Sequence, residues 1–399
     1  MKEKKQHIVI IGGGFGGVKT ALELCRNKEF HITLVSDQPH FRYNPTLYHT
    51  ATGGALRQSF ILLKDLFEGS SVELIQDELV SLDRDNQTVK LKSEKLLKYD
   101  KLVLALGSVT NYFGIPGMKE HAFGIKSLNE ITRFKKHLHK QLEDDKQPDL
   151  NYLIVGGGPT GIELAGMLPE YIRELSNRHE TRKKKVNVWL IEVAPHLLGR
   201  SHKSISRAVE KRLRKLGVKL IMGKAVKSVD DDSMIVGDKD IPSKTIIWTA
   251  GTSNNPFFTK NKFALDERGK VIVDNHMIAE KNIYVIGDNA ATKFSGMAQT
   301  ALYDAQYIAH DIEAKFHGNN GSAYRPKTPG YVIPVGRSWA AFELGKLHFS
   351  GRAGWLMRQA GDWIGYTDVE PWWRAVDRVL SEYDDEEDCS ICSKKLSNN

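Results

Sequence analysis

Two glycine-rich turns, each lying between a short apolar run and a helical pattern, constrain the fold of this chain more than any other feature. The first turn follows the apolar run Ile8–Ile11, and the second follows Tyr152–Val155. A further apolar run comes after each helical pattern, at His31–Val35 and at Val186–Ile191. The turn glycines are Gly12, Gly14 and Gly17 in the first unit, and Gly156, Gly158 and Gly161 in the second. Each unit therefore predicts a strand–turn–helix–strand arrangement.

Glycines at this spacing allow a tight turn, let a pyrophosphate approach the backbone, and let the helix pack on the strand. The N-terminus of the helix then stabilises the phosphates. We therefore predict an α/β fold with two Rossmann-like, dinucleotide-binding domains. A chain that holds two dinucleotides usually pairs a flavin with a nicotinamide and passes a hydride between them. A duplicated fold with one inactive site is the alternative.

The residue at the end of the second strand indicates which dinucleotide each unit takes. In the second unit this residue is Glu192, whose carboxylate can accept both hydroxyls of an adenosine ribose and would repel a 2′-phosphate. Glu192 therefore predicts NADH rather than NADPH. In the first unit the expected acid falls at Ser36, and Asp37 comes one position later. Asp37 is either the ribose ligand or a solvated loop acid.

Composition and charge exclude several classes of protein. Of the 399 residues, 27% are charged and 41% are hydrophobic, which is ordinary for a globular protein and excludes a mainly disordered, collagenous or coiled-coil chain. The net charge of +8 permits an acidic membrane surface or nucleotide phosphates as partners, and no nucleic-acid-binding motif accompanies it. No run of 18 apolar residues lacks a charge, so we expect any membrane contact to be peripheral.

Three further segments are similar to motifs of the two-dinucleotide flavoprotein reductases. They are Tyr99–Ser108, like the strand that closes the first FAD segment; Thr245–Gly251, like the motif where the chain returns from the NAD domain; and Asn282–Ala290, like the second FAD motif. The resemblance implies that Gly107 and Gly251 contact the cofactors. It also implies that Asp288 hydrogen-bonds the ribityl chain of the flavin.

Finer features resemble one branch, the type II NADH dehydrogenases, which pass electrons from NADH to a quinone without pumping protons. These features are the loop Phe41–Gly54, the turn Gly156–Glu163 and the segment Met297–Ala301. The resemblance implies that Pro45 and Thr46 lie along the flavin, and that Gln299 donates a hydrogen bond to a quinone carbonyl. His49, in the same loop as Pro45, is either an acid or the partner in a structural hydrogen bond.

Glu163 and Tyr303, which lie in these motifs, each allow two interpretations. Glu163 either acts near the nicotinamide and the flavin, holding NADH or supplying a proton, or is an acid stabilised by the helix dipole. Tyr303 stands where the family often has a second glutamine, which leaves the identity of the acceptor open. Tyr303 either stacks in the acceptor pocket or fills the helix core. Met167 also stands where a glutamate is common, without affecting flavin or NADH binding.

The cysteines exclude thiol chemistry at the flavin. Disulfide reductases and sulfide:quinone oxidoreductases of this fold need cysteines that reach the flavin, whereas Cys25 lies alone on the first helix pattern. The acceptor must then be a quinone, oxygen or a one-electron protein. The other two cysteines, Cys389 and Cys392, follow the acidic run Asp384–Asp388 and supply too few ligands for a closed metal site. Three cysteines make no disulfide framework, which favours a reducing compartment.

The C-terminal part combines tryptophans, arginines and helical spacing. Five of the seven tryptophans lie after residue 338, and Pro371 separates two expected helices. Their apolar residues are Trp355, Leu356, Trp363 and Ile364 in the first, and Trp372, Trp373, Val376, Val379 and Leu380 in the second. Such helices suit the headgroup layer of a membrane. A dimer core or a domain cover is the alternative, and docking and dimerisation are compatible.

Together these features predict a discontinuous FAD domain (1–114 and 253–325), an NADH domain (115–252) and a C-terminal docking or dimerisation segment with an acidic tail (326–399). We expect NADH oxidation through FAD to a membrane quinone, in a peripheral protein on the cytoplasmic side of the cell membrane. One alternative is a soluble NADH oxidase or diaphorase that reduces oxygen or a carrier protein. The other is a redox-sensing protein that binds FAD and NADH without turnover.

Overall fold

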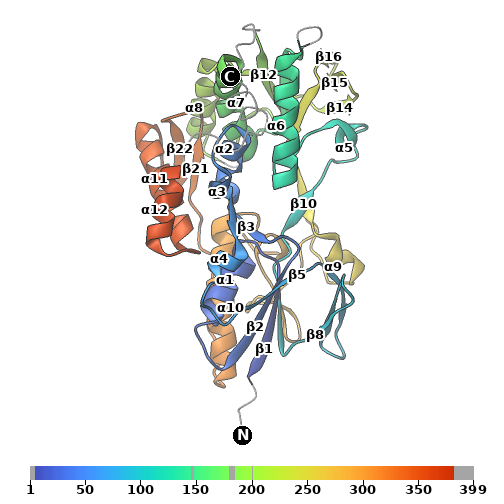
Figure 1. Ribbon diagram of the computed structural model, residues 1–399, viewed down its shortest axis with the longest axis vertical. Helices are drawn as coiled ribbons and strands as arrows, with labels where there is room; N and C mark the ends of the chain where they lie inside the picture. The colour runs from blue at the N-terminus through green and yellow to red at the C-terminus, as the bar shows by residue number, and fades with distance from the viewer. Residues whose placement is uncertain (1–4, 145–147, 179–184, 200, 382–399) are drawn as a thin grey trace, which may run out of the picture.

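Two β-sheets form the centres of the lower and upper halves of the molecule (Figure 1); the upper one is parallel, and the lower one is parallel except for its edge strand β19. The computed structural model describes residues 5–144, 148–178, 185–199 and 201–381. The strands of the lower sheet are, in spatial order, β19 (Ile278–Glu280), β20 (Ile283–Val285), β9 (Lys101–Leu104), β1 (Gln6–Ile11), β2 (Phe30–Ser36) and β5 (Glu73–Gln76). Those of the upper sheet are β13 (Lys219–Met222), β12 (Asn187–Glu192), β11 (Asn151–Val155) and β17 (Thr245–Trp248).

Smaller antiparallel sheets and helices surround these centres. The three-stranded sheets are β6 (Leu79–Asp83), β7 (Thr88–Leu91), β8 (Leu96–Lys98); β14 (Val226–Val229), β15 (Ser233–Val236), β16 (Lys239–Pro242); and β21 (Tyr331–Pro334), β22 (Ala340–Leu344), β23 (Leu347–Gly351). The two-stranded pairs are β3 (His40–Arg42) with β4 (Phe60–Leu62), and β10 (Ser108–Thr110) with β18 (Thr252–Asn254). The helices are α1 (Phe15–Leu24), α2 (Leu47–Ala51), α3 (Leu56–Ser59), α4 (Leu63–Leu66), α5 (Met118–His121), α6 (Leu128–Glu143), α7 (Pro159–Arg178), α8 (Lys203–Lys215), α9 (Pro256–Lys260), α10 (Ala298–Phe316), α11 (Arg352–Thr367) and α12 (Trp372–Leu380), with 3-10 turns η1 (Asn44–Thr46) and η2 (Gly287–Asn289).

The apolar runs of the sequence form the buried centre of each sheet. Ile8, Val9 and Ile10 of β1 are completely buried, as are Leu153 and Ile154 of β11. Apolar residues on both faces are typical of parallel strands that are covered on both sides. Helices α1 and α10 pack against each other beside the lower sheet. The predicted α/β class with two Rossmann-like units is therefore confirmed.

The chain leaves the lower half and returns to it through paired crossover strands. Ser108 of β10 lies opposite Asn254 of β18, and the pairing is antiparallel. After the return, β20 pairs in parallel with β9, so the lower sheet is built from two distant stretches of chain. The indole Nε1 of Trp248 donates to the carbonyl of Asn111 at 3.0 Å. This bond links the outgoing chain after β10 to the returning chain before β18. The precise domain boundaries stay a prediction.

The last described part of the chain forms a small sheet and two helices along one side of the molecule (Figure 1). The turn after β21 packs tightly on α7, because a Cβ at Gly166 would lie 2.6 Å from the backbone nitrogen of Gly336. Helices α11 and α12 are the two helices expected around Pro371. In the described part of the chain no helix is long and apolar enough to cross a membrane. Cys389, Cys392 and the acidic run lie outside the described residues.

Candidate functional site

The first glycine turn forms a cradle at the carboxyl end of β1. Gly12 has φ +118°, a conformation that glycine adopts without strain. A Cβ at Gly17 would collide with the carbonyl of Gly12, so only glycine lets α1 approach the strand this closely. A Cβ at Gly14, by contrast, would meet nothing within 4 Å. Gly14 is also the N-cap of α1, and its cap makes no side-chain hydrogen bond. The turn therefore offers open space and backbone N–H groups to a phosphate.

The second turn repeats this geometry at the end of β11. Gly156 has φ +119°, and a Cβ at Gly161 would collide with the carbonyl of Gly156. Gly158 faces open space, like its counterpart in the first turn. Both turns thus fit the pyrophosphate of a dinucleotide, and both precede a helix of ten residues or more.

The residue at the end of the second strand differs between the two dinucleotide-binding units. Glu192 lies at the end of β12, where its Oε2 accepts from the backbone N–H of Gly157 at 2.5 Å and its Oε1 accepts from that of Ala194 at 2.8 Å. These bonds hold the carboxylate against the glycine turn, where a ribose would lie. Ser36 is buried at the end of β2 and its hydroxyl donates to the carbonyl of Gln38 at 2.8 Å, whereas Asp37 is exposed. Their roles toward a ribose stay predictions.

Asp288 and Asn289 lie in η2, just after β20, and they contact the chain at Gly107 and Ser108. The Oδ2 of Asp288 accepts from the hydroxyl of Ser108 at 2.9 Å. The fully buried amide of Asn289 accepts from the N–H of Gly107 at 2.9 Å and donates to the carbonyl of the same residue at 2.8 Å. It also donates to the side chain of Asn254. Sequence reasoning did not single out Asn289, although it directly follows Asp288 in the second FAD-like motif.

Gly251 lies where the chain leaves the upper sheet. A Cβ there would come within 2.6 Å of the ring of Phe113 and within 2.7 Å of the carbonyl of Asn111. The glycine is therefore required by close packing between the two crossings. A contact between Gly251 and a cofactor stays a prediction.

The loop that contains Pro45 and Thr46 is anchored from several sides. The buried hydroxyl of Thr46 lies 2.9 Å from that of Ser59. His49 Nδ1 lies 2.7 Å from Oε1 of Gln58, so the ring takes part in a structural hydrogen bond. Residues of α2, which follows directly, belong to the hydrophobic core that surrounds α7 in the upper half. The loop thus joins the two halves at the site.

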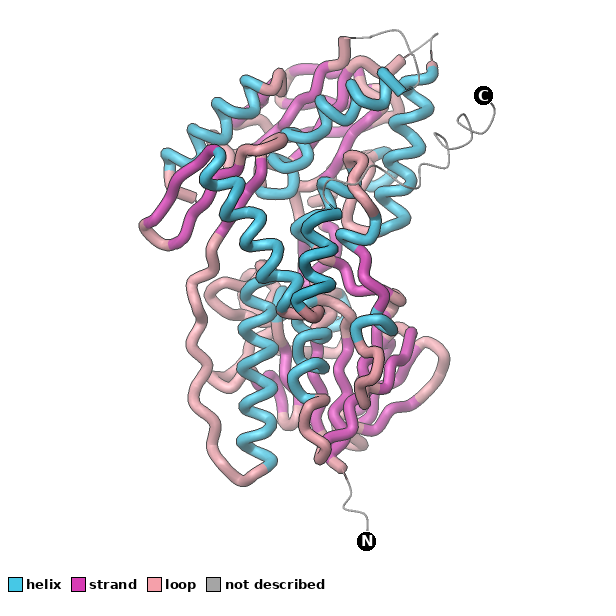
Figure 2. Tube along the Cα trace, turned by 60° about the vertical axis from the view of Figure 1, so that its left-hand side comes forward, coloured by secondary structure: helices cyan, strands magenta, loops and turns pink. Residues whose placement is uncertain are grey.

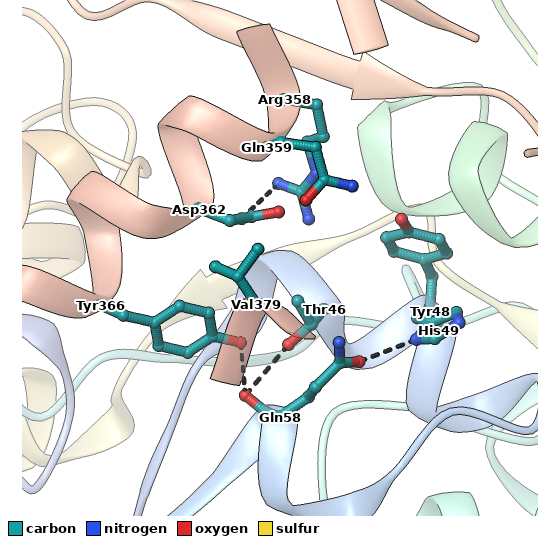
Figure 3. Close-up of a pocket in the computed structure, with 9 residues that line it drawn as sticks. All are labelled: Thr46, Tyr48, His49, Gln58, Arg358, Gln359, Asp362, Tyr366 and Val379. Carbon is teal, nitrogen blue, oxygen red and sulfur yellow. Dashed lines mark hydrogen bonds and ion pairs between the residues drawn. The ribbon is translucent and has the colours of Figure 1, made fainter. Parts of the chain in front are cut away.

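A small pocket, which we call the cavity, lies between this loop and the C-terminal helices (Figure 3). It is lined by Thr46, Tyr48, His49, Gln58, Arg358, Gln359, Asp362, Tyr366 and Val379. Its wall is thus made of aromatic rings, amides and an ion pair.

Arg358 and Asp362 of α11 form a buried ion pair in the cavity wall. Nη1 of Arg358 lies 2.8 Å from Oδ1 of Asp362, and both side chains are less than 10% exposed. Nη2 of Arg358 donates to the carbonyl of Pro45 at 2.9 Å. The hydroxyl of Tyr43 donates to Asp362 at 3.2 Å, and its ring stacks on Tyr366 with 4.1 Å between centroids. A charged helix face is therefore packed onto the loop beside the predicted flavin.

Glu163, in the first turns of α7, interacts electrostatically with this pair. Burial raises the pKa of Glu163 to about 8; the charge of Arg358 opposes that rise and the charge of Asp362 adds to it. The carboxyl is therefore protonated at neutral pH. An acid whose pKa lies this close to neutrality can hold and release a proton. Neither Arg358 nor Asp362 was identified as a site residue from the sequence.

The structure places Gln299 and Tyr303 on successive turns of α10. Gln299 is exposed, and its Oε1 accepts from the backbone N–H of Gly330 at 2.9 Å. Tyr303 is half-buried, and Nζ of Lys327 lies 4.8 Å from the centre of its ring. Neither side chain is among those that line the cavity. A role for either residue at a quinone stays a prediction.

Comparisons with known proteins identify the family. Residues 6–305 match the family described as pyridine nucleotide-disulphide oxidoreductase. The type II NADH:quinone oxidoreductase Ndh of Mycobacterium tuberculosis is 30% identical over 389 residues, with 89% of this chain and 83% of that protein covered. The chain belongs to the type II NADH:quinone oxidoreductase family. The family predicted from the motifs is therefore confirmed.

Other members and solved structures agree with this placement. The type II NADH:quinone oxidoreductase of Staphylococcus aureus is 25% identical, with 84% of this chain and 89% of that protein covered. NDH2 from Plasmodium falciparum, in complex with NADH, has a TM-score of 0.86 at 17% identity, over 95% of this chain and 98% of that one. The sulfide:quinone oxidoreductase of Aquifex aeolicus has a TM-score of 0.77 at 22% identity, over 96% and 98% of the two chains. At these identities the structural likeness concerns the fold.

The matched family is described as pyridine nucleotide-disulphide oxidoreductase, but Cys25 does not fit disulfide chemistry. Cys25 is the C-cap of α1 and the only cysteine in the described residues. Burial raises the pKa of its thiol, which keeps it protonated and unreactive. In the part of the chain that the structure describes, a thiol-based acceptor is therefore excluded.

Proposed function

We propose that this protein oxidises NADH through bound FAD and passes two electrons to a membrane quinone. The observation that carries the proposal is the cavity between the Pro45 loop and α11. Its wall holds an ion pair that acts on the buried, protonatable Glu163 of the NADH-binding helix. A quinone that takes up two electrons also takes up two protons, so a neutral acid beside this pocket suits such an acceptor.

The two glycine turns divide the cofactors between the halves. The first turn and Asp288 hold FAD, while the second turn and Glu192 hold NADH. FAD supplies the chemistry of accepting a hydride and delivering electrons to the acceptor. The protein contributes binding, orientation and charge. Pro45 and Thr46 form the wall along the flavin, and the ion pair of α11 fixes that wall through the carbonyl of Pro45.

Glu163 holds a proton near the cavity, because Arg358 and Asp362, whose charges both act on Glu163, line the cavity. With its pKa at about 8, the carboxyl carries this proton at neutral pH and can release it as negative charge builds up on the acceptor. Gln299, which lies on α10 outside the lining of the cavity, donates a hydrogen bond to a carbonyl of the acceptor.

The C-terminal helices dock on the membrane surface. Helix α11 buries the charged pair Arg358 and Asp362 and exposes several large apolar side chains, which an ordinary surface helix does not do. The exposed apolar side chains on α11 and α12 are Leu356, Met357, Trp363, Ile364, Trp372, Trp373, Val376 and Leu380. An apolar surface of this kind, rich in tryptophan, suits the interface of a bilayer. Docking brings the cavity to a lipid-soluble quinone on the cytoplasmic side of the cell membrane.

The test compares NADH oxidation by FAD-loaded protein with and without a short-chain quinone, in buffer and with vesicles that contain anionic lipid. We expect strong quinone dependence and vesicle binding that Trp372→Ser/Trp373→Ser weakens. Leu96→Ser, which alters an equally exposed apolar residue on β8, is the matched control.

Each other outcome supports a different function. Equal NADH consumption without quinone identifies a soluble oxidase or diaphorase. Reduction of the flavin without steady turnover identifies a redox sensor. A dimer that forms without lipid, and that the tryptophan substitutions dissociate, assigns the same apolar surface to a second copy of the chain.

A further inference from the structure

The chain between α10 and β21 runs back along α10 as a long loop (Figure 2). We name residues 317–330 the return segment. It contacts α10 in antiparallel order. The hydroxyl of Tyr307 donates to the carbonyl of Ser322 at 2.7 Å, the hydroxyl of Tyr324 donates to the buried Asp304, Lys327 lies over the ring of Tyr303, and Gly330 donates to Gln299. The segment therefore follows one face of the helix over its whole N-terminal half.

The end of the return segment is held on both sides of Gly330. Toward the N-terminus, Asp304 accepts from Tyr324 and from the backbone N–H of Gly287, which binds the segment to the turn that carries Asp288. Toward the C-terminus, β21 begins at Tyr331 and pairs with β22. The N–H of Gly330 is thus a fixed donor rather than part of a freely moving loop.

This donor determines how the side-chain amide of Gln299 is oriented. A glutamine amide has an acceptor end, the carbonyl oxygen, and a donor end, the NH₂ group. The N–H of Gly330 binds the acceptor end at 2.9 Å. The NH₂ group is then the end left to bind a ligand, and a quinone presents only carbonyl acceptors.

We propose that the return segment is a positioning element, in which the backbone N–H of Gly330 orients Gln299 so that its NH₂ group donates to a carbonyl of the acceptor. This inference rests on the proposed quinone reduction for its purpose, whereas the bond itself can be tested without quinone. Gly330 is a positioning residue, because it acts through Gln299.

Position 330 offers a matched pair of variants. Gly330→Pro removes the N–H donor, whereas Gly330→Ala keeps it. Alanine fits, because a Cβ at Gly330 would meet its nearest neighbour, Cδ1 of Leu344, at 3.5 Å, which is ordinary contact. The φ of Gly330 also lies outside the left-handed region. Gln299→Glu complements the pair, because a carboxylate accepts from Gly330 but donates nothing at neutral pH.

The experiment measures the KM for a short-chain quinone and, separately, the rate of flavin reduction by NADH. We expect Gly330→Pro and Gln299→Glu each to raise the KM about three- to tenfold, the range that corresponds to one hydrogen bond. Flavin reduction and the Gly330→Ala variant should stay within about twofold of wild type. The double variant Gln299→Ala/Gly330→Pro should be no worse than Gln299→Ala alone, because the two residues act as one unit. Additive effects would overturn the inference.

Amide hydrogen exchange at Gly330 tests the bond in the absence of quinone. We expect this amide to exchange several-fold faster in Gln299→Ala than in wild type, and Gln299→Glu to restore its protection. Equal exchange in wild type and Gln299→Ala would overturn the positioning inference, even if quinone reduction is observed. If wild type reduces no quinone while the exchange difference is present, the proposed function fails and the orientation of Gln299 by Gly330 stands.

Discussion

Replacing Glu163 by glutamine should make the protein more stable in a pH-dependent way. In the folded protein burial raises the pKa of Glu163 to about 8, compared with 4.5 for the free side chain. Between these values the folded state holds a proton that the unfolded state has lost, so stability falls as the pH rises. The difference corresponds to about 3 kcal/mol at pH 7 and to about 5 kcal/mol above pH 8. Glutamine is neutral in both states and avoids this cost.

The assay is thermal unfolding of the FAD-loaded protein at pH 5 and at pH 8.5. We expect Glu163→Gln and wild type to have nearly equal Tm at pH 5, and the variant to have the higher Tm at pH 8.5. Glu170→Gln, which removes a carboxylate from a more exposed position on the same helix, is the control for a simple loss of charge. A Tm difference between Glu163→Gln and wild type that is the same at both pH values would refute the reasoning.

Three other substitutions test separate parts of the site. Arg358→Met should destabilise the protein by about 3 kcal/mol, since it breaks a buried ion pair, and should shift the pKa of Glu163 above 8 in a pH–rate profile. Glu192→Ala should raise the preference for NADPH over NADH about tenfold or more in kcat/KM, because a repelling carboxylate is lost; an unchanged ratio would contradict its assignment. Asn289→Ala should lower stability by about 2 kcal/mol and weaken FAD retention in dialysis, because both polar groups of Gly107 lose their partner.

The parts of the fold that depend on local pattern could be predicted from the sequence. The run Ile8–Ile11 lies within β1, and Val186–Ile191 largely coincides with β12. The glycine turns were predictable because their geometry depends on neighbouring residues and on the absence of a side chain. The apolar sides of α11 and α12 followed from helical spacing, since the exposed residues recur with the period of the helix.

The wall of the cavity could not be predicted, because it depends on contacts between distant parts of the chain. The bond from Arg358 to the carbonyl of Pro45 joins residues 313 positions apart. Arg358 and Asp362 lie off the apolar side of their helix, where polar residues usually face water, yet both are buried. The bonds from Asn289 to Gly107 and from Gly330 to Gln299 likewise need the tertiary fold. No periodicity in the sequence identifies such partners.

The central claim is that electrons from NADH leave the bound flavin to a quinone, with Glu163 supplying a proton. The most direct test is anaerobic stopped-flow spectroscopy, in which NADH first reduces the flavin and a short-chain quinone is then mixed in. We predict rapid recovery of the oxidised flavin absorbance with quinone, slow recovery with oxygen alone, and a recovery rate that falls at least tenfold in Glu163→Gln while reduction by NADH is preserved. Recovery that is equally fast with oxygen and with quinone, or unchanged in Glu163→Gln, would contradict the account.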